Sequence, residues 1–182
     1  MADVKDPQRV MPIIGLISAS TLETDIFAEL EGKIGRVVLK SKSIPFCHTM
    51  YYNQEMGDGL TRQWCAFGNL VIPDSLVELK HMTNTLEKKY LNRQGGRRVN
   101  IDPGMVSLGN LILASTKNYS HRIYLGQGIY AEVTLIFRQK RFVPLDWTYP
   151  DYRDEAALEF FAAARDILRE RLIENREGTI KE

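Results

Sequence analysis

Two runs of alternating apolar and polar residues, within SHRIYLGQGIYAEVTLIF (120–137), constrain the fold of this chain most strongly. A period of two places successive side chains on opposite faces of a strand. The runs flank Gly126, Gln127 and Gly128, and glycine readily takes the positive φ angles that a tight three-residue turn requires. We therefore predict a β-hairpin here, and with it an antiparallel sheet.

The predicted hairpin has one apolar face and one polar face. Its cross-strand pairs are Leu125 with Ile129, Tyr124 with Tyr130, Ile123 with Ala131 and Arg122 with Glu132. The polar face then carries Arg122, Tyr124, Tyr130, Glu132 and Thr134. The same parity puts His121 on the apolar face, opposite Val133.

The opening of the chain predicts a strand followed by a helix. MPIIGLIS (11–18) is a short run rich in β-branched residues, which is typical of a buried strand. TLETDIFAELEGK (21–33) has its apolar residues at helical spacing, and Gly32 is expected to end that helix. A second strand is predicted at 36–46.

The middle of the chain predicts a helix by its capping pattern. Asn84, followed three residues later by Glu87, has the form of a capping box and predicts a helix over residues 85–92. LTRQWCAFGNL (60–70) also fits a helix, with a strand as the alternative.

After this helix RRVNID (97–102) alternates as a strand. Pro103 and Gly104 are expected to end it, and the apolar stripe of MVSLGNLILAST (105–116) favours a helix. Asp102 could then simply cap that helix.

These elements predict an α+β fold. We expect a single domain, 1–182, with a mixed, mostly antiparallel sheet, helices packed mainly on one face, and a C-terminal amphipathic helix at 154–175. A length of 182 residues, 44% hydrophobic and 26% charged, suits one globular domain. The ends, 1–9 and 176–182, are expected to be flexible.

Composition and missing motifs exclude several classes of protein. The formal net charge of +1 argues against a nucleic-acid partner, and MPIIGLI (11–17) is too short to span a membrane. Cys47 and Cys65 are too few for a disulfide scaffold, so we expect a cytoplasmic protein. The sequence has no phosphate-binding loop of the G-x-x-x-x-G-K-S/T type, no dinucleotide fingerprint, and no hydrolase or zinc motif. It therefore indicates no particular cofactor and no metal site.

Polar residues nevertheless concentrate between Arg97 and Arg153. In the strand at 97–102, parity puts Arg98, Asn100 and Asp102 on one face and Arg97 on the other. If this strand and the hairpin share a sheet, their polar faces merge into one surface that could bind an anion. The candidate catalytic residues are Asp102, His121 and Glu132. The candidate ligand-binding residues are Arg97, Arg98, Asn100, Lys117, Arg122, Tyr124, Tyr130, Tyr149 and Asp151.

Each of these signals also has an ordinary structural explanation. An antiparallel sheet often has one solvated face, where a pair such as Arg122 and Glu132 is only a surface contact. His121 could be a hydrogen-bonded structural histidine. WTYPDYR (147–153) could be a turn before the last helix rather than an aromatic binding surface, because Pro150 forces an extended residue before it.

Several long strings resemble a known family. They include MYYNQEMG (50–57), TNTLE (83–87), GGRRVNIDPG (95–104), ASTKNYSHRIYLGQGIYAEVTL (114–135) and WTYPDYR (147–153). Through them the chain resembles a bacterial family catalogued as domain of unknown function 4416, over nearly its whole length. The resemblance implies that the family pattern includes Arg97, Arg98, Asn100, Asp102, Lys117, His121, Arg122, Tyr130, Glu132, Asp151 and Tyr152. It implies no activity; some relatives carry the label GTP-binding protein, which the missing phosphate loop does not support.

We therefore expect a protein that binds an anionic small molecule, phosphorylated or nucleotide-like. The alternative is a non-catalytic interaction domain or homo-oligomer that presents the aromatic residues of 147–152. RNA binding through a Tyr124 and Tyr130 stacking pair is a third hypothesis, against which the low net charge argues.

Overall fold

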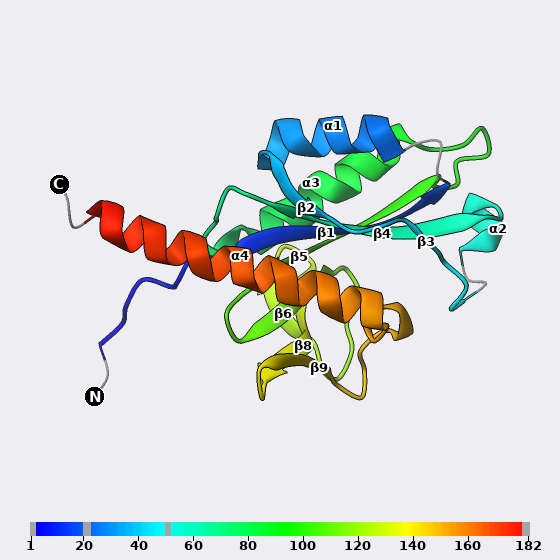
Figure 1. The fold of residues 1–182 in the computed structure, drawn as a ribbon. Helices are drawn as coiled ribbons and strands as arrows, with labels where there is room; N and C mark the ends of the chain where they lie inside the picture. Colours follow the sequence, from blue (N-terminus) through cyan, green and yellow to red (C-terminus); the bar gives the residue numbers. More distant parts are fainter. Residues whose placement is uncertain (1–2, 20–22, 50–51, 180–182) are drawn as a thin grey trace.

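The computed structural model describes residues 3–19, 23–49 and 52–179 (Figure 1). Its strands are β1 (Met11–Ala19), β2 (Val37–Lys40), β3 (Ile44–Pro45), β4 (Leu60–Phe67), β5 (Val99–Val106), β6 (Asn110–Ser115), β7 (Ile123–Gly126), β8 (Ile129–Arg138) and β9 (Arg141–Pro144). Its α-helices are α1 (Glu23–Ile34), α2 (Asn53–Met56), α3 (Leu76–Lys89) and α4 (Glu155–Thr179), and 3₁₀ turns lie at Pro73–Ser75 and Pro150–Tyr152. The fold is α+β, as predicted.

The strands form one sheet in the order β2-β4-β1-β5-β6-β8-β7, with β3 paired to β4 and β9 paired to β8. Every described strand pair is antiparallel. The order places β1 between β4 and β5, so the first strand of the chain is at the centre of its half of the sheet. Both faces of MPIIGLIS are apolar because core clusters lie on both sides of β1, one with Met11 and Ile13 and the other with Ile14 and Leu16.

Helices cover both faces of the sheet (Figure 1). On one face Ile14 and Leu16 of β1 pack against Ile26 of α1 and Leu86 of α3. On the opposite face Trp64 of β4 is in the same core cluster as several side chains of α4, namely Phe160, Phe161, Ala164 and Leu168. Two of the three long helices thus share one face, and the C-terminal amphipathic helix covers the other.

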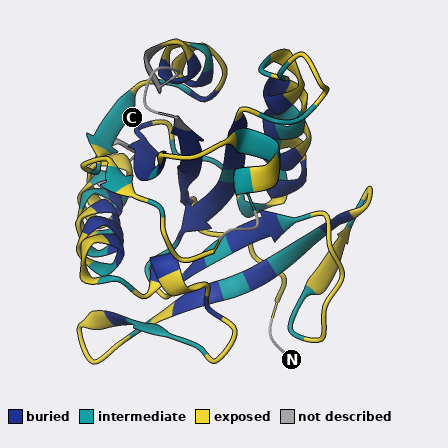
Figure 2. Ribbon diagram, turned by 90° about the vertical axis from the view of Figure 1, so that its right-hand side faces the viewer, coloured by how far each residue is buried: buried dark blue, intermediate teal, exposed yellow. Residues whose placement is uncertain are grey.

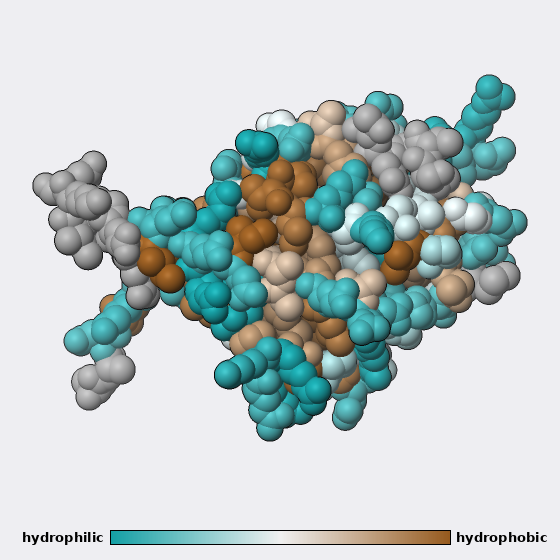
Figure 3. Space-filling view, in the orientation of Figure 1, coloured by the Kyte–Doolittle hydropathy of each residue, from teal (hydrophilic) through white to brown (hydrophobic). Residues whose placement is uncertain are grey.

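The layering leaves most apolar side chains inside. Buried residues concentrate on the strands and on the helix sides that face the sheet (Figure 2). Hydrophilic side chains dominate the visible surface, although apolar ones gather in the band between α1 and α4 (Figure 3). None of the helices in the described ranges is long and apolar enough to cross a membrane.

The sheet opens between β5 and β6. β5 pairs with β1 from Val99 onward, but its pairing with β6 covers only Gly104–Val106. Pro103 lacks an N–H group and therefore cannot donate to β6, so the ladder stops there. Before it, the N–H of Ile101 donates to Glu87 Oε1 at 2.6 Å, and α3 thus supplies the acceptor that a neighbouring strand would have offered.

The structure corrects several expectations from the sequence. Gly32 does not end the first helix, because α1 continues to Ile34. MVSLGNLILAST is not a helix but the end of β5, the turn and strand β6 of the β5–β6 hairpin, and Pro103 and Gly104 do not end β5. Asn84 does not cap a helix, because α3 already begins at Leu76. In the segment 60–70 the alternative holds, since residues 60–67 form strand β4. Strands buried on both faces have apolar residues at every position, and such runs imitate a helical stripe.

The β7–β8 hairpin is confirmed, with the pairs Tyr124 to Tyr130 and Ile123 to Ala131. The register is wrong at the turn, where Gly126 rather than Leu125 opposes Ile129 across an irregularity. The expectation that the apolar face is buried and the polar face is exposed is also wrong. Glu132 is 2% exposed whereas Ile123 is 68% exposed, because β7 is an edge strand that no helix covers.

The two ends predicted to be flexible lie partly outside the described residues, at 1–2 and 180–182. Within them, α4 continues to Thr179.

Candidate functional site

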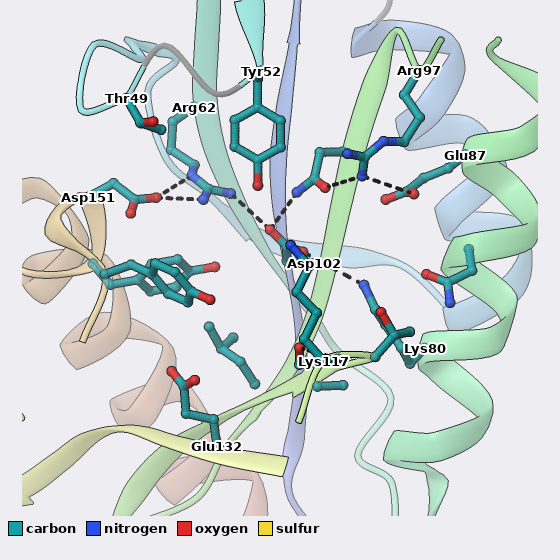
Figure 4. A pocket seen from close by; sticks show the side chains of 18 of the residues that line it. Thr49, Tyr52, Arg62, Lys80, Glu87, Arg97, Asp102, Lys117, Glu132 and Asp151 are labelled. Carbon is teal, nitrogen blue, oxygen red and sulfur yellow. Dashed lines mark hydrogen bonds and ion pairs between the residues drawn. The ribbon is translucent and has the colours of Figure 1, made fainter. Parts of the chain in front are cut away.

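A cavity of about 830 Å³ lies where β5 and β6 separate (Figure 4). Its lining comes from α3, from Arg62 of β4, from β5 and β6, from Glu132 of β8, and from the turn 149–152 that precedes α4. Phe46, His48, Thr49, Tyr52 and Arg122 also line it. This volume is in the range of small-molecule sites. The gap in the β5–β6 ladder therefore opens a space large enough for a metabolite.

Arg62 lies at the floor of the cavity, with its side chain only 5% exposed. Its Nε donates to Asp151 Oδ2 at 2.7 Å, and its Nη2 lies 2.5 Å from the same oxygen. The third nitrogen, Nη1, is buried and has no hydrogen-bond partner among the described residues; the Asp102 carboxylate is 3.8 Å away. Burial opposes the charge, but the neighbouring Tyr152, Asp151 and Asp102 outweigh it and hold the pKa of Arg62 above its usual value.

Asp102 is at the centre of the cavity (Figure 4). Its Oδ2 accepts a hydrogen bond of 2.6 Å from Asn100 Nδ2, and its Oδ1 is 3.7 Å from Lys80 Nζ. Its side chain is 27% exposed. The other three carboxylates that line the cavity, those of Glu87, Glu132 and Asp151, are all less exposed. It can accept a hydrogen bond from a ligand.

Arg97 closes one wall through a chain of ion pairs. Its Nε and Nη2 donate to the two carboxylate oxygens of Glu55 at 2.9 and 2.8 Å, and its Nη1 donates to Asn100 at 2.9 Å. Hydrogen bonds from Arg97 lower the pKa of Glu55, whereas burial raises the pKa of Glu87 on the neighbouring helix. The prediction that Arg97 lies on the face opposite Asn100 is wrong. β5 begins only at Val99, so strand parity does not extend back to residue 97.

Arg122 and Glu132 form the opposite wall. Arg122 Nε donates to Glu132 at 2.9 Å, its Nη1 donates to Ser115 and to the Lys117 carbonyl, and its Nη2 donates to Tyr149 at 2.8 Å. All three nitrogens of Arg122 are thus engaged, and this arginine holds β6, β8 and the 149–152 turn together. Arg122 therefore forms part of the cavity wall, and its nitrogens already bind groups of the protein.

His121 is not on an apolar face opposite Val133, as parity suggested. It precedes β7, and its Nε2 is 3.0 Å from Glu132 Oε2. Its ring stacks on Trp147 at a centroid distance of 4.9 Å. His121 is therefore not part of the cavity lining, but it contacts Glu132, which is.

Tyr152 and Gly15 complete the floor. Tyr152 is 1% exposed, and its hydroxyl is buried with no hydrogen-bond partner among the described residues. A Cβ atom on Gly15 would lie 2.5 Å from that hydroxyl and 3.0 Å from Arg62 Nη1. Glycine is thus required here by close approach, and the two unpartnered groups lie side by side over the backbone of β1.

The structure brings most of the predicted site residues together. Those that line the cavity are Arg97, Asn100, Asp102, Lys117, Arg122, Glu132, Tyr149 and Asp151. Those that do not are Arg98, His121, Tyr124 and Tyr130. Arg98 is exposed, and Tyr124 belongs to the edge strand.

Sequence reasoning missed several lining residues, chiefly Tyr52, Arg62, Lys80, Glu87 and Tyr152. Arg62 had a usable signal, because a charged residue is unusual within a buried strand such as LTRQWCAF. Lys80 and Glu87 are seven residues apart, two turns of one helix, so they share a side of α3. Both residues lie within α3, which begins at Leu76 rather than at the predicted residue 85.

Ten charged side chains line the cavity, six basic and four acidic. The basic ones are Arg62, Lys80, Lys88, Arg97, Lys117 and Arg122, and the acidic ones are Glu87, Asp102, Glu132 and Asp151. Within 3–19, 23–49 and 52–179, no group of three His, Cys, Asp or Glu side chains is arranged to hold a metal ion. The cavity is therefore formally positive.

Comparison with known proteins gave one result. The model of a family described as Domain of unknown function (DUF4416) matches residues 8–168, a range that contains every residue lining the cavity. Neither the curated proteins nor the solved structures contain a match.

Proposed function

Because the chain belongs to the DUF4416 family, as its resemblance indicated, and the family description names no activity, we propose a function from the cavity alone: it binds an anionic small molecule, phosphorylated or nucleotide-like. The observation that carries the proposal is the excess of six basic over four acidic side chains around one cavity of about 830 Å³. A chain with a formal net charge of only +1 has concentrated positive charge there.

The lining also offers groups that would orient such a ligand. Hydroxyl and amide side chains from Tyr52, Asn100 and Ser115 lie among the charged ones, and Phe46 adds an aromatic surface. Asp102, at the centre of the cavity, is the carboxylate that a bound molecule would meet most directly, because Glu132 is only 2% exposed and already bound by Arg122 and His121. Asp102 is therefore the carboxylate best placed for acid or base chemistry on the ligand.

The proposal can be tested by thermal unfolding in the presence of nucleotides, sugar phosphates, inorganic phosphate and divalent ions. A ligand at about 100 times its Kd should stabilise the protein by roughly 2.7 kcal/mol. The stabilisation should fall in Lys117→Ala, because Lys117 lines the cavity, and persist in Arg98→Ala, because Arg98 is exposed outside it.

Two outcomes would contradict the proposal. One is that no anion in the panel raises the unfolding temperature. The other is that stabilisation disappears in Arg98→Ala but survives in Lys117→Ala, which would place the anion outside the cavity.

One observation favours a second candidate, an interaction surface at the edge strand. Ile123, Tyr124 and Leu125 of β7 are 68%, 58% and 42% exposed, and Trp147, in the loop between β9 and α4, is 39% exposed. Edge strands with exposed apolar residues readily pair with other chains. Light scattering of the wild type and Ile123→Lys tests it; a strictly monomeric wild type at high concentration would remove self-association from consideration.

A further inference from the structure

The charges of the cavity are not evenly distributed in depth. Among the charged lining residues that are buried or partly buried, four are basic and four are acidic. The basic ones are Arg62, Lys80, Arg97 and Arg122, and the acidic ones are Glu87, Asp102, Glu132 and Asp151. Lys88 and Lys117 are the two exposed ones. The inside of the cavity is therefore formally neutral, and its positive excess lies at the mouth.

The floor presents unpartnered hydrogen-bonding groups. Arg62 Nη1 and the Tyr152 hydroxyl are both buried and make no hydrogen bond of ordinary geometry to the described residues, although the Trp64 side chain lies close enough to interact with the hydroxyl. Such groups carry a free-energy penalty that a ligand can relieve. Both lie over Gly15, and Asp102 is 3.8 Å from the same Arg62 nitrogen.

This floor suits a hydroxyl group better than a phosphate. A hydroxyl oxygen can accept from Arg62 Nη1 or from Tyr152, while its own hydrogen is donated to Asp102. A phosphate at the same place would offer only acceptors and would bring negative charge against Asp102 and Asp151. Asp151 already neutralises Arg62 through two contacts to one oxygen.

We infer that the ligand is a phosphate ester of a hydroxylated compound, whose hydroxyl-bearing end reaches Arg62, Tyr152 and Asp102 while its phosphate stays at the mouth with Lys88 and Lys117. The inference rests on the proposed function and deepens it. Sugar phosphates and nucleoside monophosphates share this chemistry, and the cavity volume of about 830 Å³ accommodates either.

The two ends can be tested separately by titration calorimetry. The compounds are a pentose phosphate, its deoxy analogue, a nucleoside monophosphate, free pentose and inorganic phosphate. Tyr152→Phe removes only the unpartnered hydroxyl, so it should weaken the hydroxylated esters roughly 3- to 10-fold and leave inorganic phosphate unchanged. Tyr119→Phe, at an exposed tyrosine outside the cavity, is the matched control.

Lys88→Ala and Lys117→Ala test the mouth. Each should weaken the esters and inorganic phosphate roughly 2- to 5-fold, with the effect reduced by salt, and should leave free pentose unaffected. Lys33→Ala, at an exposed lysine of α1, is the control. If the nucleoside monophosphate binds and the pentose phosphate does not, the ester is a nucleotide; the reverse identifies a sugar phosphate.

The inference is overturned if inorganic phosphate binds with the same Kd as the esters and Tyr152→Phe changes neither of these Kd values. That result would leave the proposed function standing, because an anion would still bind. If none of the anions binds, both fail. Unfolding of Tyr152→Phe, expected within about 1 kcal/mol of the parent, checks that a lost ligand does not reflect a lost fold.

Discussion

Gly15→Ala is the most informative single substitution, because it adds one methyl group to the place where β1, Arg62 and Tyr152 meet. The new Cβ would lie 2.5 Å from the Tyr152 hydroxyl, 3.0 Å from Arg62 Nη1 and 3.4 Å from Trp64. Gly15 has no positive φ, so the substitution introduces no backbone strain. Its effect must come from the contacts alone.

Tyr152 has little room to move away. It is 1% exposed, and its ring stacks on Phe161 at an interplanar angle of 9° and a centroid distance of 5.7 Å. Overpacking of this kind typically destabilises by about 1–3 kcal/mol. For a domain of this size each kcal/mol lowers Tm by about 2–4 °C. We therefore expect Gly15→Ala to lower Tm by several degrees and to weaken any ligand that depends on the floor.

The assay is denaturant and thermal unfolding of Gly15→Ala, Tyr152→Phe and the double variant. Because the shortest contact involves the hydroxyl, Tyr152→Phe in the Gly15→Ala background should recover about 0.5–3 kcal/mol. Gly32→Ala is the control, since nothing lies within 4 Å of its added Cβ and a helix gains about 1 kcal/mol from alanine. A Gly15→Ala protein as stable as the parent, or a double variant with no recovery, would refute this account of the packing around Gly15.

Three further predictions concern carboxylates. Burial raises the pKa of Glu87, so its contribution to stability is most favourable below pH 4.5 and is lost as pH rises through the folded pKa. Over that pH range the stability of Glu87→Gln, measured by denaturant unfolding at each pH, should increase relative to that of the parent. Arg97 lowers the pKa of Glu55, so Glu55→Gln should destabilise above pH 4.5, with the difference vanishing as pH falls through the folded pKa. Glu132→Ala leaves Arg122 buried at 8% exposure without its carboxylate and should lower the free energy of unfolding by about 3–5 kcal/mol; a loss below 1 kcal/mol would contradict the pairing.

Local patterns predicted the elements whose length, periodicity and end signals agree. The strand at 11–18 is β1, the helix at 21–33 overlaps α1, and the C-terminal helix is α4. The β7–β8 hairpin also followed from its alternation and its glycines. In these segments the apolar residues, the turn residues and the expected element all point to one structure.

The failures occurred where tertiary burial overrides the pattern. MVSLGNLILAST lies in strands whose two faces are both covered, so its apolar residues do not alternate. Glu132 was placed on a solvated face, yet the structure buries it because Arg122 and His121 satisfy its carboxylate. Parity alone cannot indicate which face of a sheet a helix or loop will cover.

The sequence by itself determined the family, the α+β class and a group of polar residues that ends up around one cavity. Asp102 and Glu132 could be found without a structure, because they stand out in alternating segments, whereas alternation placed Arg97 on the wrong face. Only the tertiary structure decided where the cavity opens and that Arg62 lines it. Arg62 meets Asp151 across 89 positions of sequence, and the gap depends on Pro103 ending a ladder that α3 then replaces. Pairings over such distances depend on how the whole chain packs, and no local pattern carries that information.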